Sequence, residues 1–314
     1  MYKKVYEKIK AYDSIVIARH KSPDFDAYGS QFGMYFALKE YFPEKTFYLY
    51  GDENDLNPFF AMDDVTEDIL KESLLIIVDT AASQMLSGDF YNHAKSIVII
   101  DHHRNDADID HDIYVRDVDA SSAAEMVYDF LKENHIPLNK DVAKAIYIGI
   151  IGDTGRFMYA NATAGTFHAV GDLLKQGIDI QAIHNRMYVE TLKHKKLKAE
   201  FVKTFEMTDH NVAYRKNTKA FLDDFDVDTH YVSRGMVNQM GGIEEIPIWA
   251  NFTYDQKSGK ILCELRSRGI PVLDIAKKYG GGGHLHACGC SLDTWEETDH
   301  VLNDLDRLLE EHNG

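Results

Sequence analysis

Acidic and histidine residues gather in four short segments of the first half of the chain. The segment 20–26 holds two aspartates and a histidine, position 79 a single aspartate, and 101–103 an aspartate and two histidines, while 149–155 (GIIGDTG) holds one aspartate between glycines. The residues are His20, Asp24, Asp26, Asp79, Asp101, His102, His103 and Asp153. So many carboxylates would repel one another if they converged without compensating charge. Their convergence would therefore predict bound divalent cations.

Each segment has a plainer explanation when it is taken alone. A polar loop accounts for 20–26, a turn or helix cap for Asp79, a polar turn for 101–103 and a helix end for Asp153. Convergence favours the metal centre, because unrelated turns have no reason to meet. Carboxylates with imidazoles and no thiolate suit Mn²⁺ or Mg²⁺ better than structural zinc, and two histidines favour Mn²⁺. Two such ions that share a carboxylate can stabilise both the attacking and the leaving oxygen of an in-line phosphoryl displacement. Phosphate-ester hydrolysis is therefore the expected reaction class.

The elements around these segments explain how they would meet. Short runs rich in β-branched residues predict buried strands at 14–18, 46–50, 74–79 and 96–101, and amphipathic patterns predict helices at 26–41, 120–133, 141–151 and 163–176. Strands that are apolar on both faces and alternate with helices indicate an α/β fold with a mostly parallel sheet. The carboxyl ends of such strands share one edge of the sheet, where ligands bind.

The pattern changes near residue 190. A lysine-rich stretch at 191–207 predicts a linker helix between a catalytic domain, 1–190, and a smaller α/β domain, 208–314. In the second domain the sequence predicts strands at 211–221, 246–254, 260–266 and 287–292 and helices at 271–279 and 296–311.

A glycine run at 280–283 stands out in the second domain. Successive glycines can aim several N–H groups at an anion, or they can form a flexible hinge. Arginines shortly before the run and a histidine directly after it favour anion binding, since an arginine fork suits a terminal phosphate. The expected substrate-binding residues are Arg266, Arg268, Gly281, Gly282, Gly283 and His284.

Composition excludes several classes of protein. The 314 residues carry 34 Lys and Arg against 51 Asp and Glu, a net charge of −17 that argues against binding a long nucleic-acid duplex on a basic face. Three cysteines do not make a secreted disulfide framework. Because no apolar run resembles a signal peptide or approaches the ~20 residues of a membrane span, we expect a cytoplasmic protein without a membrane partner. The acidic run 106–112 lacks the glycine of a calcium loop and is expected to be solvated.

Taken in order, the motifs resemble a known family. HKSPDFDAYGS (20–30), VD (78–79), DHH (101–103) and GDTG (152–155) resemble the four motifs of the DHH phosphoesterase superfamily, and GGGGH (280–284) resembles the signature of its DHH-associated domain. With its length and TGRF at 154–157, the sequence resembles the bifunctional oligoribonuclease (nanoRNase) and pAp phosphatase group.

The resemblance implies two divalent cations per chain. One would be held by His20, Asp24 and Asp79, and the other by Asp26, Asp79, His102 and Asp153, with Asp79 bridging. Asp101 would orient a ligand histidine, His103 would face the scissile phosphate, and a hydroxide between the cations would attack in line. The implied substrates are very short single-stranded RNA, cleaved to mononucleotides, and pAp-type nucleotides, which lose the 3′-phosphate.

Other functions stay open at this point. The alternatives are a phosphodiesterase for cyclic or linear signalling dinucleotides, a manganese inorganic pyrophosphatase and a nucleotide sensor without turnover. The glycine run argues against the pyrophosphatase, and the complete ligand set argues against the sensor. Two residues depart from the family pattern. Gly152 takes the place of a hydroxyl residue in the fourth motif, which would change the surroundings of the ligands, and His286 after the glycine run has no assigned role and leaves substrate preference open. The polarity of cleavage, the preferred length and a homodimer are open as well.

Overall fold

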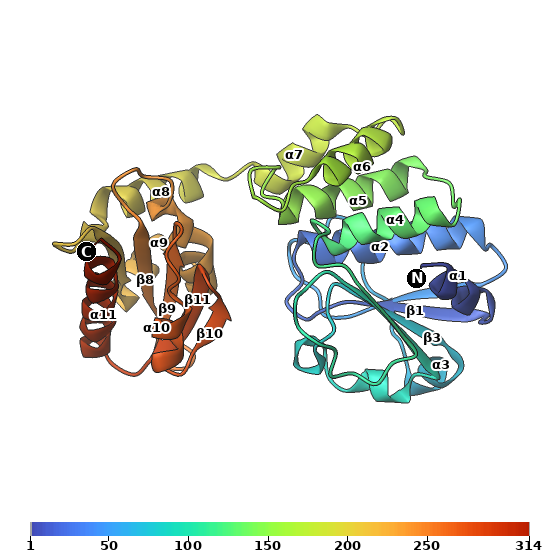
Figure 1. The fold of residues 1–314 in the computed structure, drawn as a ribbon, viewed down its shortest axis with the longest axis horizontal. Helices are drawn as coiled ribbons and strands as arrows, with labels where there is room; N and C mark the ends of the chain where they lie inside the picture. The colour runs from blue at the N-terminus through green and yellow to red at the C-terminus, as the bar shows by residue number, and fades with distance from the viewer. Residues whose placement is uncertain (1, 314) are drawn as a thin grey trace. The chain divides into compact units, whose positions relative to one another are not determined.

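The computed structural model describes residues 2–313, and the chain divides into two compact units between Val189 and Glu190. Each unit has its own sheet and its own covering helices (Figure 1). Within the described residues, we find no helix that has both the length and the apolar character needed to cross a bilayer.

The sheet of the first unit has five strands in the order β2-β1-β3-β4-β5, and all neighbours are parallel. This confirms the predicted α/β class and, to within one residue, the four predicted strands. The fifth strand was not predicted, because it is a half-buried edge strand that follows a polar loop. The strands are β1 (Ser14–Ala18), β2 (Thr46–Tyr50), β3 (Leu74–Val78), β4 (Ser96–Asp101) and β5 (Ile113–Arg116).

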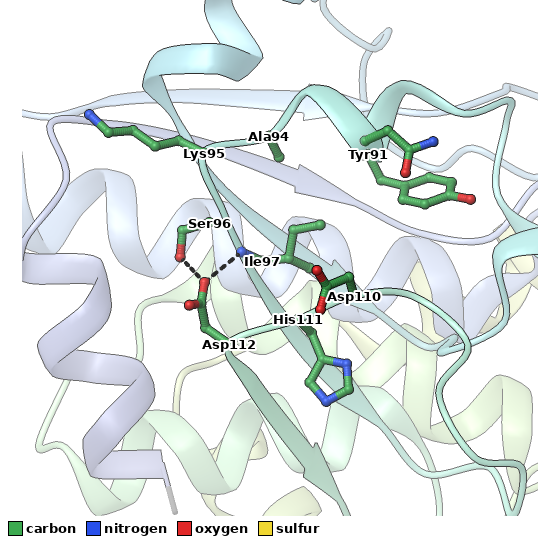
Figure 2. Close-up of a pocket in the computed structure, with 9 residues that line it drawn as sticks. Tyr91, Ala94, Lys95, Ser96, Ile97, Asp110, His111 and Asp112 are labelled. Atoms are coloured by element: carbon green, nitrogen blue, oxygen red, sulfur yellow. Dashed lines mark hydrogen bonds between the residues drawn. The ribbon is translucent and has the colours of Figure 1, made fainter.

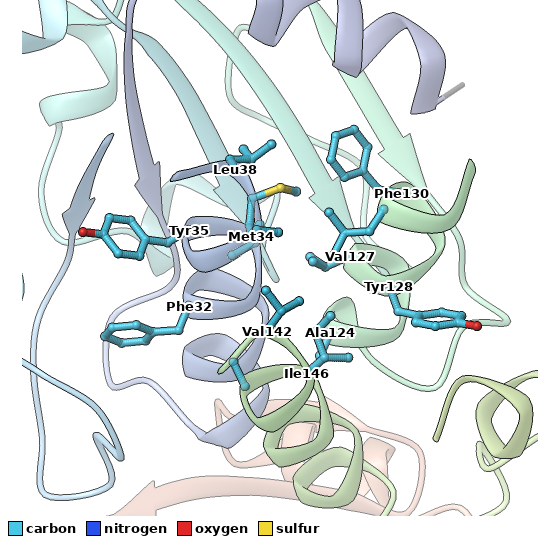
Figure 3. Packing of buried hydrophobic residues seen from close by; sticks show 14 of the residues in the cluster. Phe32, Met34, Tyr35, Leu38, Ala124, Val127, Tyr128, Phe130, Val142 and Ile146 are labelled. Atoms are coloured by element: carbon cyan, nitrogen blue, oxygen red, sulfur yellow. The ribbon is translucent and has the colours of Figure 1, made fainter. Parts of the chain in front are cut away.

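The main core of the first unit is formed by three helices together with one face of the sheet. Figure 3 shows side chains of α2 (Phe25–Tyr41), α4 (Ala123–Glu133) and α5 (Lys140–Asp153) packed together, among them Met34, Val127 and Ile146. This packing fixes the ends of α2 and α5 that carry candidate ligands. The remaining helices are α1 (Tyr2–Lys10), α3 (Glu67–Glu72), α6 (Ala164–Leu174) and α7 (Ile180–Tyr188), with 3₁₀ turns at Ser83–Met85 and Phe90–His93.

The second unit has a six-stranded sheet in the order β10-β11-β9-β8-β7-β6, antiparallel except for the parallel pair β7 and β8. The strands are β6 (Glu206–Met207), β7 (Val212–Asn217), β8 (Ile248–Tyr254), β9 (Ile261–Ser267), β10 (Gly282–His284) and β11 (Ala287–Leu292). The helices are α8 (Leu192–Thr204), α9 (Lys219–Phe225), α10 (Leu273–Lys278) and α11 (Trp295–Asn313), with a π-helical turn at Tyr231–Gly235 and a 3₁₀ turn at Val237–Met240.

Two predicted elements differ from the structure. The helix expected over 191–207 ends at Thr204, and it buries Leu197 and Phe201 in the core of the second unit, so it is not a solvated connection. The strand expected over 211–221 stops at Asn217, because the Thr218 side chain accepts a hydrogen bond from the Phe221 N–H and begins α9.

Candidate metal centre

The parallel sheet brings the acidic and histidine segments together at one edge. The segments after β1 and β3 and at the end of β4 meet the last residue of α5 there, and their side chains form three groups whose ligand atoms lie within 4.8 Å of one another. The groups are His20 with Asp24 and Asp79, Asp26 with His102 and Asp153, and Asp79 with His102 and His103. All six residues expected to bind metal are therefore neighbours in space.

Backbone contacts orient the groups around His20. Its Nδ1 lies 2.8 Å from the Lys21 carbonyl oxygen, which can only accept, so Nδ1 donates and a neutral ring leaves Nε2 free for a cation. Nε2 lies 3.3 Å from Asp79 Oδ2 and 3.9 Å from Asp24 Oδ1. The same Asp24 oxygen accepts from the N–H groups of Asp26 and Ala27 and thereby caps α2.

Asp79 stands between the two candidate ligand histidines. While Oδ2 faces His20, Oδ1 lies 3.4 Å from His102 Nε2 and makes no hydrogen bond, although it is buried. His102 Nε2 also lies 3.8 Å from Asp26 Oδ2 and 3.9 Å from Asp153 Oδ2. A buried carboxylate oxygen without a donor, ringed by imidazole and carboxylate groups, fits a divalent cation.

The first residues of α4 hold Asp26. Its two oxygens accept from the Ala123 N–H at 2.7 Å and from the Ala124 N–H at 2.9 Å, at the positive end of the helix dipole. Sequence reasoning missed this contact, which joins segments almost a hundred residues apart. In the sequence, the residue that could have indicated the start of α4 is Ser122, whose hydroxyl caps the helix by accepting from the Glu125 N–H.

Burial and mutual repulsion dominate the electrostatics of the cluster. Burial raises the pKa of Asp26 well above its ordinary value and that of Asp153 to about 6. Burial also opposes ionisation of Asp79, but the His102 and His20 rings outweigh it and lower that pKa. In turn, burial disfavours charge on the rings, yet the carboxylates raise the pKa of His20 to about 11 and that of His102 to about 10. Without cations, protons on the histidines thus balance the carboxylates.

His103 has a different environment from its neighbour. Its Nδ1 lies 2.7 Å from Asp101 Oδ1, and this hydrogen bond raises the pKa of the ring. The expected contact between Asp101 and a ligand histidine goes instead to His103. Asp101 is fully buried, whereas 41% of the His103 side chain is exposed. An oriented ring that can be reached from solvent suits contact with a substrate.

A second missed residue is Asn161. Its side-chain amide donates to the Asp153 carbonyl oxygen at 3.2 Å and to the Ser121 carbonyl oxygen at 2.9 Å, and it lies 3.5 Å from Asp153 Oδ2. Between these residues the backbone is left-handed at Gly155, Arg156 and Phe157, with φ of 53°, 63° and 65°. Such conformations are costly for the two residues that are not glycine, and they cluster at functional sites.

In the second unit, Arg266 and His284 share one row of the sheet. Both lie opposite Ala287, Arg266 in β9 and His284 in β10, so their side chains emerge on the same face roughly 10 Å apart. Arg266 Nη2 donates to Glu264 at 3.2 Å. Arg268 lies beyond the end of β9 and donates to the Glu244 carbonyl oxygen. His286 Nδ1 lies 3.2 Å from the Ile270 carbonyl oxygen, a contact that braces the turn after β9.

The glycine run is not the free phosphate nest that the sequence predicted. The N–H groups of Gly280 and Gly281 donate to carbonyl oxygens of α10, and Gly282 and Gly283 belong to the edge strand β10. Close approach to β11 requires glycine here, because a Cβ at Gly283 would lie 2.7 Å from the Cα of Cys288.

The acidic loop 106–112 forms no metal cluster among residues 2–313. The loop lines part of a pocket of about 280 Å³ at the start of β4, at the end of this strand opposite the metal centre. Figure 2 shows the residues that line it. In this pocket the Asp112 carboxylate accepts hydrogen bonds from the Ser96 hydroxyl at 2.5 Å and from the Ile97 N–H at 3.2 Å. Asp108 likewise accepts hydrogen bonds from the N–H and the hydroxyl of Ser83. Both carboxylates therefore anchor the loop to neighbouring segments.

Similarity to known proteins extends over nearly the whole chain. The model of the DHH family, N-terminal domain, matches residues 14–150, and that of the DHHA1 domain matches residues 218–311. Two relatives are 34% identical: the bifunctional oligoribonuclease and PAP phosphatase NrnA of Bacillus subtilis, with 97% of both chains covered, and the probable protein of the same name in Streptococcus mutans, with 98% of this chain and 99% of the relative.

A solved structure agrees with these relatives. The exopolyphosphatase-related protein of Bacteroides fragilis is 25% identical and superposes with a TM-score of 0.87, covering 98% of this chain and 97% of its own. Both domain models match in the expected order, and the similarity to the Bacillus subtilis relative covers 97% of this chain. The chain therefore belongs to the DHH family.

Proposed function

We propose that this protein is a metal-dependent phosphoesterase that cleaves very short single-stranded RNA to mononucleotides and removes the 3′-phosphate from pAp-type nucleotides. The observation that carries the proposal is the buried Asp79 carboxylate, which presents one oxygen to His20 at 3.3 Å and the other to His102 at 3.4 Å. Relatives named for both activities, similar over nearly their full length, support the choice of substrates.

The cluster fits two divalent cations per chain. His20, Asp24 and Asp79 would hold one, and Asp26, Asp79, His102 and Asp153 would hold the other. Mn²⁺ is the expected ion, because each group combines an imidazole with carboxylates, and Mg²⁺ is the second choice. When bound, the cations would activate water and neutralise the transferring phosphoryl group.

His103 supplies chemistry that belongs to the chain itself. Its hydrogen bond to Asp101 fixes the ring and raises its pKa, which favours the protonated form that can donate to a phosphate oxygen. We assign to it a hydrogen bond to the scissile phosphate, and Asp101 holds it in that orientation. General acids in such positions contribute about 10²–10⁴-fold to a rate.

The second unit carries the groups that would hold the substrate. Arg266 and His284 emerge on one face of its sheet, and we assign them to a terminal phosphate, together with Arg268, the edge-strand backbone of Gly282 and Gly283, and Gly281 directly before that strand. Recognition of an end explains how a chain of net charge −17 handles short RNA and excludes long duplexes. An RNA substrate and the free thiols of Cys263, Cys288 and Cys290 fit a cytoplasmic location.

A substrate panel tests the proposal. Purified protein with Mn²⁺ is given a 5′-phosphorylated RNA dinucleotide, pAp, a cyclic dinucleotide and inorganic pyrophosphate, and products are resolved by chromatography. We expect mononucleotides from the RNA and inorganic phosphate from pAp, each at least tenfold faster than turnover of the other two. Preferential hydrolysis of the cyclic dinucleotide or of pyrophosphate would replace our assignment with one of those alternatives.

A further inference from the structure

A second hollow in the first unit has the chemistry of a ligand site and is separate from the metal centre. It lies between α5 and α7, which are neighbours in Figure 1, and has a volume of about 210 Å³. Its apolar wall is formed by Pro58, Ile148, Ile178, Ala182 and Ile183.

Three cationic side chains stand around this apolar wall. Lys140 and Lys144 lie one turn apart on α5, and Arg186 projects from α7. Within residues 2–313 none of the three forms an ion pair with a carboxylate, even though acids outnumber bases in the chain by 51 to 34. Asp179, the one acid of the lining, accepts from the Ala182 N–H and caps α7. The lining therefore carries three positive charges and one negative charge.

The orientation of α5 separates this hollow from the catalytic cluster. Asp153 comes nine residues after Lys144, which at 3.6 residues per turn places it on the opposite side of the helix and about 14 Å along the axis. A molecule in the hollow would therefore not be substrate bound at the metal centre.

We propose that this hollow binds a free nucleoside monophosphate, with the base against the apolar wall and the phosphate among Lys140, Lys144 and Arg186. The net charge of +2 matches a phosphate monoester dianion, and a hollow of about 210 Å³ suits one ring system better than a long chain. Arg186 already donates to the Asn57 carbonyl oxygen at 3.1 Å, which holds its planar guanidinium beside the wall. Such a group both stacks on rings and pairs with phosphate. Nucleoside monophosphates are products of the proposed function, so the choice of ligand rests on it.

Calorimetric titration with AMP tests the site on the full-length protein. EDTA is present so that the metal centre holds no cation to bind phosphate. The double variant Lys144→Gln/Arg186→Gln should lose one equivalent of bound AMP or bind it at least tenfold more weakly. The control Lys132→Gln/Lys175→Gln removes the same charge from lysines that pair with Asp172 elsewhere in the first unit, and it should bind like the wild type. Ala182→Trp, which fills the hollow without changing charge, should also abolish binding.

Two outcomes would overturn the inference. One is AMP binding to the double variant with wild-type stoichiometry and affinity, and the other is inorganic phosphate binding as tightly as AMP, which would mean that the apolar wall contributes nothing. RNA hydrolysis is measured separately with Mn²⁺. If RNA is cleaved while AMP binding is unchanged in the double variant, the inference fails alone, and if AMP binds this site but no RNA is cleaved, the proposed function fails alone.

Discussion

Gly29 of α2 and Gly149 of α5 face one another without side chains between them, and a Cβ at Gly29 would lie 2.6 Å from the Gly149 Cα. A Cβ at Gly149 would lie 2.9 Å from Asp26 Oδ1. Glycine at both positions lets the two helices approach closely enough for Asp26 and Asp153 to enter one cluster. Glycine is thus required at position 149 for steric reasons, because a side chain there would disturb both the packing of the helices and the Asp26 carboxylate of the site.

Gly149→Ala should lower both stability and metal affinity. Overpacking of this kind costs about 1–3 kcal/mol, and the added methyl group also displaces the Asp26 carboxylate. Denaturant unfolding and Mn²⁺ titration measure the two effects. Gly171→Ala is the matched control, because its Cβ would meet nothing within 4 Å in α6, and it should be neutral or slightly stabilising. Equal behaviour of the two variants would contradict the steric account.

The sequence predicted the first unit better than the second, for physical reasons. Strands that are buried on both faces, such as β3 and β4, have continuous apolar runs that local pattern reveals. The edge strand β5 and the short helix α9 depend on partners or on a single cap, so the pattern around them is weak. The convergence of the three segments at strand ends followed from parallel-sheet topology, whereas Asp153 is placed by the packing of α5.

Contacts between distant segments could not be predicted. The N–H groups of Ala123 and Ala124 that hold Asp26, and the Asn161 amide beside Asp153, depend on the packing of α4 against α2 and on the path of the chain after α5. The glycine run illustrates the opposite error. Its composition suggested a free loop, but its last two glycines pair with β11 and form part of the edge strand β10.

The two adjacent histidines should respond differently to substitution. His102→Ala should weaken Mn²⁺ binding, because its Nε2 faces Asp26, Asp79 and Asp153. His103→Ala should keep the metal and lower kcat by roughly a hundredfold or more, since it removes a proton donor. Metal analysis after dialysis and steady-state kinetics separate the two effects. Restoration of His103→Ala to wild-type rate by excess Mn²⁺ would show that its role is ligation.

Asp129 gives the fold a pH dependence that is independent of the metal centre. Burial, followed by repulsion from Glu125, Asp117 and Glu133, raises its pKa from 3.8 to about 6. A carboxyl group with a raised pKa contributes stability below its ordinary pKa and loses that contribution as pH rises through about 6. Asp129→Asn should therefore melt above the wild type at pH 8 and exceed it by a clearly smaller margin at pH 5. A difference of the same size at both pH values would contradict the assignment.

Substrate binding by the second unit predicts a defect that spares the metal centre. Arg266→Ala and His284→Ala should each lower kcat/KM for the dinucleotide by about 10–100-fold, mainly through KM, because a hydrogen bond to a charged group contributes about 1.5–3 kcal/mol. Bound Mn²⁺ should be unchanged. Lys260→Ala is the control, since this exposed lysine lies next to the other end of β9 and pairs only with Asp293 among the described residues. A loss of metal in Arg266→Ala, or an equal defect in Lys260→Ala, would remove the assigned role.

The most direct test of a metal-dependent phosphoesterase centred on Asp79 is a titration of metal-stripped protein with Mn²⁺ while mononucleotide release from a labelled RNA dinucleotide is followed. We predict no release before addition, a rate that saturates near two equivalents per chain, and at least a thousandfold lower rate for Asp79→Asn at every Mn²⁺ concentration. Cleavage by the stripped protein at the full rate, or wild-type turnover by Asp79→Asn, would contradict the account.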